Sequence, residues 1–263
     1  MSDQSIIDYI LHLGDNALVL GHRNSEWTGH GPILEQDIAL SNIALDLIGQ
    51  ARFYYQCASR RINAADGASR PFPGHEALTE DVLAYHRDAW DFRNCLLVEQ
   101  SNGHWGKTVL RQFFFSAWQF ELYGALRHSR DSQLAAIAAK SLKEVTYHLR
   151  WSGEWVIRLG DGTEESHTRM EEALGDLWKY TGELFVPADY EKSLALAGVA
   201  VDLATIRPAW ELKVGEVLGA AGLERKEGEW MQKGGKQGKH TEALGYLLAE
   251  MQFLQRAYPG CEW

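Results

Sequence analysis

The segment from Lys107 to His128 reads KTVLRQFFFSAWQFELYGALRH and carries apolar side chains on nearly every face of a helix. The segment from about Ile33 to Ile62 has the same character. Its apolar side chains fall on several helix faces: Ile38, Ile43, Leu45, Leu47, Ile48 and Phe53. A helix that is apolar all round is normally central and buried. These two stretches therefore predict an all-α protein built around long central helices.

Each of these stretches has a helical neighbour in the sequence. A periodic segment from about Ile6 to Glu26 precedes the first one. After the second one, Asp131 or Ser132 can cap a helix that runs to about Leu159, because a short side-chain oxygen accepts hydrogen bonds from free first-turn N–H groups. The two helix pairs, at about 6–62 and 107–159, predict an antiparallel four-helix bundle.

Helical periodicity continues outside these two pairs, in the stretches of about 76–98, 164–185, 205–223 and 241–258. The last stretch has a single apolar stripe, so it is expected to pack on one side only. This stripe comprises Leu244, Leu247, Leu248, Met251 and Leu254. We expect one domain over residues 1–263, in which the C-terminal helices of about 164–258 pack outside the bundle.

Composition excludes several classes of protein. The 263 residues carry 26 Lys and Arg against 36 Asp and Glu, a net charge of −10, which argues against a nucleic-acid-binding surface. The cysteines Cys57, Cys95 and Cys261 are too scattered for a disulfide framework or a zinc site. The longest apolar run, Leu194–Val201, is far shorter than the ~18 residues of a membrane span. With no signal-like basic and apolar start, we expect a cytoplasmic protein without a membrane partner.

A bundle of this kind can hold two irons through a Glu from each of two helices and a Glu-x-x-His from each of the other two, as ferritin-like proteins do. Only Glu164-x-x-His167 has that spacing in this sequence. It follows a Gly-rich turn, where acidic residues at a helix start are favoured by the helix dipole. We interpret it as a solvated helix start, so the bundle lacks a di-iron ligand set.

Several motifs spread over the whole chain resemble the phenylacetic acid catabolism protein C family. They are Leu13–Leu20, Ala44–Arg52, Leu96–Gln100 with Asn102-Gly103, Lys143-Glu144 with Tyr147–Arg150, Gly234–Lys236, His240–Glu242 and Leu248–Gln252. The resemblance implies a ferritin-like fold and the role of structural, non-catalytic subunit in the ring-1,2-phenylacetyl-CoA epoxidase, a multicomponent monooxygenase. It implies no cofactor in this chain. Expected partners are a related di-iron catalytic subunit and further small and reductase subunits.

The ligand pattern of that catalytic partner can be laid on this sequence without gaps inside either helix pair. It would fall on Ala17, Asp46, Gly49, Ser116, Val145 and His148. Only Asp46 and His148 are ligand-type residues, and two ligands do not hold a pair of irons.

Neighbouring acids leave an alternative open. Glu144 lies one turn before His148 on the same helix face. Together with Asp46 and Glu121, these residues could bind a metal and make the chain an enzyme in its own right. Our preferred interpretation is that Asp46, Glu144 and His148 form a vestigial buried polar cluster without metal, whose members hydrogen-bond with one another, and that Glu121 forms an ion pair or faces solvent. A third possibility is a helical scaffold unrelated to oxygenation.

The loop from Lys233 to His240 resembles a phosphate-binding loop superficially, but it lacks the first glycine of that motif and no strand precedes it. We interpret it as a solvated basic loop, in which Lys233, Lys236 and Lys239 are candidates for contact with a partner or with CoA. The ten Trp residues and the apolar helices predict a large interface with the di-iron subunit, and a homodimer when that subunit is absent.

Overall fold

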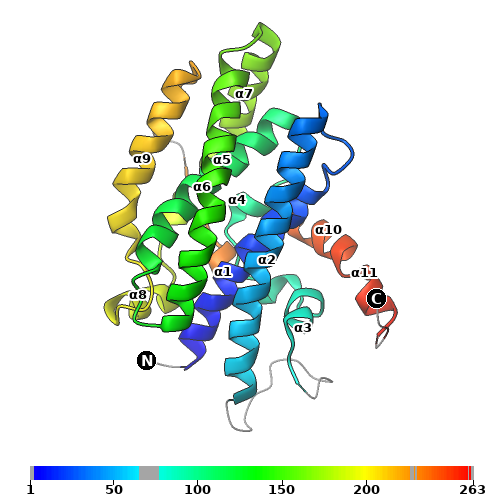
Figure 1. Cartoon of the computed structure of the whole chain (residues 1–263), viewed down its shortest axis with the longest axis vertical. Coiled ribbons are helices and arrows are strands. Elements are labelled where there is room, and N and C mark those ends of the chain that lie inside the picture. The colour runs from blue at the N-terminus through cyan, green and yellow to red at the C-terminus, as the bar shows by residue number, and fades with distance from the viewer. Residues whose placement is uncertain (1–2, 65–76, 226–227, 229, 260, 262–263) are drawn as a thin grey trace.

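The computed structural model describes residues 3–64, 77–225, 228, 230–259 and 261. In these residues the protein is all-α and contains no strand (Figure 1). The four long helices are α1 (Asp3–Ser25), α2 (Leu34–Ala64), α5 (Trp105–Leu126) and α6 (Ser132–Gly160). Asp131 caps α6, because its Oδ1 accepts from the N–H groups of Gln133 and Leu134, both at 3.1 Å. The predicted all-α class is confirmed.

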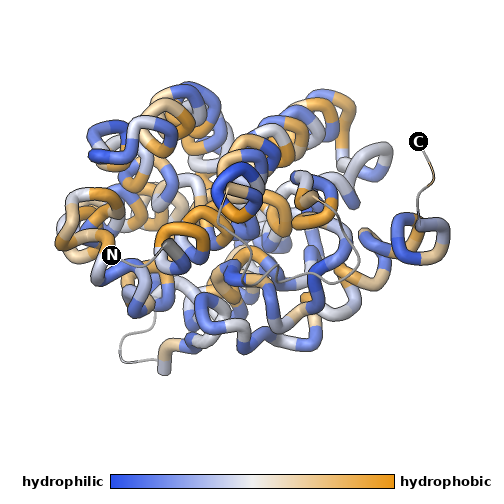
Figure 2. The backbone as a smooth tube through the Cα atoms, turned by 90° about the horizontal axis from the view of Figure 1, so that it is seen from below, coloured by the Kyte–Doolittle hydropathy of each residue, from blue (hydrophilic) through white to orange (hydrophobic). Residues whose placement is uncertain are grey.

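Side-chain contacts establish how the four helices run. From α2 to α6, Asp46 meets His148 and Gln50 meets Glu144, so the numbers rise on one helix as they fall on the other. The same inverse order links α1 to α5, where Asn24 meets Gln112 and His12 lies near Trp118. Neighbouring helices are therefore antiparallel, as in a ferritin-like bundle. Apolar side chains of all four helices join one continuous buried cluster, and Figure 2 shows hydrophobic stretches of backbone in orange along the helices.

Close packing of α1 on α2 depends on a missing side chain. A Cβ at Gly14 would lie 2.7 Å from the ring of Tyr55, inside van der Waals contact. Glycine lets the two backbones approach while the tyrosine ring stays buried. This pair makes the most extensive helix contact of the described chain.

The sequence predicted α5 and α2 as the central, buried helices. In the structure the central helices are α1 and α5. Almost every side chain of α1 from Ile6 to Gly21 is buried, as is nearly all of α5. The expectation that α2 is buried all round is wrong, because Leu34, Ile38, Leu45 and Ile48 are between 40% and 71% exposed. No described element covers that side of α2.

The expectation of a single helix over about 76–98 is also wrong. Residue 76 lies outside the described part, and the rest forms α3 (Glu80–Tyr85), the 3₁₀ turn η1 (Ala89–Asp91) and α4 (Leu96–Glu99) with extended backbone between them. Side chains from other segments capture its backbone. Asp15 accepts from the Arg93 N–H at 2.7 Å, and Asn16 accepts from the Cys95 N–H at 2.8 Å. These long-range bonds replace the local bonds of a helix.

Shorter helices complete the C-terminal half. They are α7 (Glu164–Leu177), η2 (Trp178–Tyr180), η3 (Gly182–Phe185), α8 (Asp189–Leu196), α9 (Leu203–Ala220), η4 (Gly235–Gln237), α10 (Glu242–Met251) and α11 (Phe253–Ala257). Helices α7 and α9 pack on α5, whereas α8 packs on α1. Helix α9 lies on one side of the bundle and α10 and α11 on the other (Figure 1). The stretches predicted at 164–185 and 241–258 are each divided, and α8 was not predicted. Among the described helices, none is both long and apolar enough to cross a membrane.

The interior contains a histidine whose pKa is lowered by burial. His12 of α1 is fully buried, with Nδ1 2.7 Å from the Arg93 carbonyl oxygen and Nε2 3.8 Å from Glu191. Burial lowers the pKa of His12 to about 4, although Glu191 and Asp15 raise it, and Lys236 adds to the lowering. The unfolded chain therefore takes up a proton at His12 in a pH range where the folded protein does not.

We predict that His12 makes the protein less stable in mild acid. A histidine with a depressed pKa contributes full stability above its unfolded pKa, and that contribution is lost as the pH falls from 6.5 towards about 4. Between pH 7.5 and pH 5 the loss amounts to roughly 2 kcal/mol. Urea unfolding at both pH values measures it, and His12→Gln should remove this part of the pH dependence. An equal slope in the variant would contradict the assignment.

Candidate functional site

The predicted polar cluster lies along the contact between α2 and α6. Nε2 of His148 is 2.9 Å from Oδ2 of Asp46, and the Gln50 side-chain amide donates to Oε2 of Glu144 at 2.9 Å. His148 is fully buried, whereas the Asp46 side chain is 38% exposed and Glu144 is half-buried. The structure thus brings the three predicted residues together at the edge of the bundle. Glu144 hydrogen-bonds to Gln50 rather than to its two predicted partners.

The hydrogen bonds continue from Glu144 into the bundle. Oε1 of Gln50 accepts from the Gln119 amide at 3.3 Å and from the Tyr123 hydroxyl at 3.4 Å. Desolvation raises the pKa of Glu144, and the nearby Asp46 carboxylate raises it further, while the Gln50 bond lowers it. Apart from Glu144, this network consists of neutral groups. It was missed from the sequence because glutamine and tyrosine do not signal a metal site.

The six positions on which we expected the ligand pattern of a di-iron subunit to fall do not bring a set of metal ligands together. Ala17, Ser116 and Val145 are fully buried and offer at most one hydroxyl, which accepts from Gln112 at 2.8 Å. A side chain at Gly49 would meet nothing within 4 Å, so this position points away from the core. Within the described residues, no group of three His, Cys, Asp or Glu side chains could hold a metal ion. The residues present do not fit a di-iron centre.

Two further candidate acids are placed elsewhere. The half-buried carboxylate of Glu121 has a pKa raised by desolvation, and the charge that opposes this shift is Lys213 of α9. Glu121 therefore faces α9 and is no fourth member of the cluster. In the Glu164-x-x-His167 motif, Glu164 is exposed, and Nδ1 of His167 lies 2.6 Å from the Gly160 carbonyl at the end of α6. His167 therefore caps α6.

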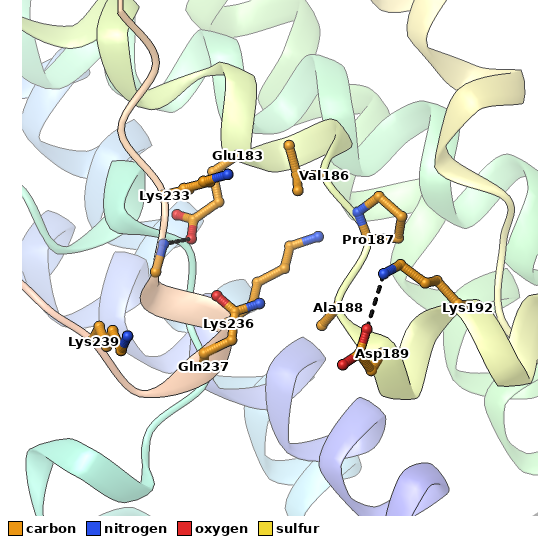
Figure 3. A pocket seen from close by; sticks show the side chains of 11 residues that line it. Glu183, Val186, Pro187, Ala188, Asp189, Lys192, Lys233, Lys236, Gln237 and Lys239 are labelled. Atoms are coloured by element: carbon orange, nitrogen blue, oxygen red, sulfur yellow. Dashed lines mark hydrogen bonds and ion pairs between the residues drawn. The ribbon is translucent and has the colours of Figure 1, made fainter.

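The three candidate lysines differ from one another. Lys233 and Lys239 are exposed, but Lys236 is 1% exposed and its Nζ lies 3.0 and 3.2 Å from the two carboxylate oxygens of Glu191. The interpretation of the whole loop as solvated is therefore wrong at Lys236. Its counter-ion lies 45 residues away on α8, so sequence spacing did not indicate the pair. Lys236 lines a pocket together with the two exposed lysines (Figure 3).

An apolar surface lies beside the polar cluster. Leu34, Ile38, Leu45 and Ile48 recur every three, four or seven residues, so they share one face of α2. We call these four residues the α2 stripe. Tyr147 of α6, 38% exposed, is the next residue before His148. Exposed apolar side chains gathered on one helix face are typical of protein interfaces.

Comparison with known proteins identifies the family of this chain. Residues 1–263 match the phenylacetic acid catabolic protein family. The chain belongs to this family. It is 47% identical over 255 residues to one of the subunits of the 1,2-phenylacetyl-CoA epoxidase of Escherichia coli (strain K12), an alignment that covers 97% of this chain and 98% of that protein. The resemblance of the sequence motifs to the family of phenylacetic acid catabolism proteins is confirmed.

We predict that the His148 side chain contributes to stability. Because His148 is fully buried and bonded to Asp46, His148→Ala should lower the free energy of unfolding by about 1–3 kcal/mol through lost packing and an unpaired partner. Chemical denaturation measures this loss. Tyr147→Ala, on the neighbouring exposed position, is the control and should cost less than about 0.5 kcal/mol.

The same variant tests for a direct chemical role. If His148 is structural, activity of a reconstituted complex should fall only as far as the amount of folded chain falls. A folded His148→Ala chain that assembles normally but supports no turnover would contradict this.

Proposed function

We propose that this chain is the structural, metal-free subunit of a phenylacetyl-CoA 1,2-epoxidase. The observation that carries the proposal is the side-chain set at the mapped ligand positions, where Ala17, Ser116 and Val145 are buried in the bundle. The Escherichia coli relative, an epoxidase subunit that is 47% identical over nearly its full length, supports it. The chain would act in the cytoplasm in phenylacetate catabolism.

In this proposal the oxygen chemistry takes place in a related di-iron subunit. The complex inserts one oxygen atom of O₂ into the aromatic ring, with electrons from a reductase subunit and with further small subunits in the assembly. This chain supports and orients the catalytic subunit. Because the two chains are expected to share a fold, they would form a pseudo-symmetric pair.

The α2 stripe is the surface that we assign to the catalytic subunit. It is apolar, it lies on a long helix of the bundle, and no described element covers it. An obligate interface of this kind is expected to bury more than ~2,000 Å² in total. The polar cluster of Asp46, Glu144 and His148 flanks the stripe and would lie close to the edge of the interface.

We predict that the purified chain binds no stoichiometric iron and does not oxidise phenylacetyl-CoA alone. Anaerobic iron loading, desalting and elemental analysis measure the metal, and an oxygen-consumption assay measures turnover. About two irons per chain together with turnover would contradict the proposal. This result would favour an enzyme that binds metal through Asp46, Glu121, Glu144 and His148.

We predict that the stripe drives assembly. Leu45→Asp combined with Ile48→Asp should weaken binding to the co-expressed di-iron subunit at least ~tenfold, since each buried Leu or Ile contributes more than 1 kcal/mol.

Light scattering after size exclusion should show a homodimer of the lone chain, replaced by a mixed assembly when the subunit is added. Leu212→Asp on α9, 67% exposed, is the control and should assemble normally. A strictly monomeric chain that does not shift with the subunit would instead support an unrelated scaffold.

A further inference from the structure

A pocket of about 330 Å³ lies between the start of α8 and the loop that contains η4 (Figure 3). Its first wall runs from Glu183 through Pro187 to Lys192. Its second wall is formed by Lys233, Gly234, Lys236, Gln237 and Lys239. The pocket therefore joins two segments that are about 45 residues apart in the sequence, and the polar cluster at α2 and α6 takes no part in it.

The charge of this pocket is opposite to that of the chain. Four lysines line it, namely Lys192, Lys233, Lys236 and Lys239, against the carboxylates of Glu183 and Asp189 in the lining and that of Glu191, which pairs with Lys236. The chain as a whole carries −10. A positive concave site on an acidic protein attracts anions locally.

The two carboxylates in the lining are already engaged. Oε1 and Oε2 of Glu183 accept from the backbone N–H groups of Gly234 and Leu96, both at 2.7 Å. Asp189 is fully exposed and pairs with Lys192 at 2.9 Å. The Asp189 charge is offset by Lys192, and both oxygens of Glu183 are occupied by backbone N–H groups. No ion pair of Lys233 or Lys239 occurs among the described residues.

Lys236 supplies a fixed cation at the base of the pocket. Its side chain is 1% exposed and is held by both oxygens of the buried Glu191. An ammonium group has three N–H donors, and Figure 3 shows the Lys236 side chain directed from the η4 loop towards Pro187 and Ala188. A donor that is already ordered loses little entropy when a ligand binds.

The loop holds its lysines in a defined shape. The Lys239 N–H and the Gln237 N–H both donate to the Gly234 carbonyl at 2.9 Å. A Cβ at Gly235 would collide with the Asn94 carbonyl oxygen, so the loop rests directly on the connection before α4. These hydrogen bonds close a turn from Gly234 to Lys239, so Lys233 directly precedes the turn and Lys239 ends it. The positive end of the α8 dipole, at Ala188 and Asp189, faces the same pocket.

We propose that this pocket binds a phosphate group. Several cationic donors around one concave site match the charge and the oxygens of a phosphate, since charge-assisted hydrogen bonds are the strong ones. The phosphate could come from inorganic phosphate or from a coenzyme A thioester, and the experiment separates these sources. The inference rests on the pocket itself and does not need the proposed structural role.

The test is calorimetric titration of the full chain at constant ionic strength with inorganic phosphate, with coenzyme A and with 3′-dephospho-coenzyme A. We expect saturable binding that Lys233→Gln combined with Lys239→Gln weakens at least ~tenfold. The matched control is Lys143→Gln combined with Lys213→Gln, which removes the same charge from α6 and α9 and should change affinity less than ~twofold. Lys236 is left intact because its loss would strand the buried Glu191.

Each outcome decides the proposal. If coenzyme A binds at least ~tenfold more tightly than phosphate, the site is assigned to the coenzyme. If 3′-dephospho-coenzyme A loses this higher affinity, the 3′-phosphate is the group that the pocket binds. Equal binding of phosphate and coenzyme A assigns free phosphate. No saturable binding of either, or equal weakening in both double variants, overturns the proposal. The proposal is also overturned if the parent chain binds no phosphate and the Lys233→Gln, Lys239→Gln variant fails to assemble with the di-iron subunit. The lysines would then contact protein.

Discussion

A buried carboxylate, Asp15 in α1, holds together the part of the structure on which the rest depends. Arg87 forms an ion pair with it, the Tyr55 hydroxyl donates to it at 2.6 Å, and the Arg93 N–H donates at 2.7 Å. Asp15 and Arg87 are essentially unexposed. A buried ion pair is tolerated when further hydrogen bonds satisfy it, and losing one partner leaves a costly buried charge. This cluster therefore fixes α1, α2 and the connection between the two helix pairs in one arrangement.

The C-terminal loop is built on that connection. Glu99 accepts from the Thr241 N–H at 2.7 Å and lies 2.7 Å from Nδ1 of His240, while Gly235 rests on Asn94. The lysine pocket thus takes its shape from a chain of contacts that begins at Asp15. In this protein, long-range buried polar pairs position the segments outside the bundle, whereas apolar packing forms the bundle itself.

The sequence predicted those parts of the fold that depend on local periodicity. The four long helices and the Asp131 cap are set by apolar spacing and by one side-chain oxygen, and both were predicted to within a few residues. The stretch at 77–98 was predicted wrongly as one helix, because its short helices α3 and α4 are separated by η1 and extended backbone. Backbone N–H groups there are captured by Asp15, Asn16 and Glu183, which no local pattern reveals. The exposure of the α2 stripe was likewise hidden, because periodicity shows which faces are apolar and not which are covered.

The sequence predicted which residues form the candidate site, but not all of the hydrogen bonds between them. Resemblance to the family placed Asp46 and His148 near one another, and they are 2.9 Å apart. The partner of Glu144 could not be predicted, since Gln50 lies 94 residues away on another helix. Lys236 shows the same limit, because a lysine in a Gly-rich loop resembles a solvated residue until its distant counter-ion is known.

The chemistry of the polar core bears on the proposed metal-free role. Carboxylates gathered in a buried centre repel one another and require a cation or protons to compensate them. Here the buried polar groups around Ser116, one of the mapped ligand positions, include the neutral side chains of Gln50, Gln112 and Gln119, whereas the buried carboxylate of Asp15 is paired with Arg87. The hydrogen bonds of the neutral side chains run from the Gln112 amide to Ser116 and from the Gln119 amide to Gln50, without an ion. The acidic members of the predicted cluster, Asp46 and Glu144, lie at the partly exposed edge, where water can solvate their charge. Neutral amides beside Ser116 therefore leave no uncompensated carboxylate at this position, which is consistent with the proposed metal-free role.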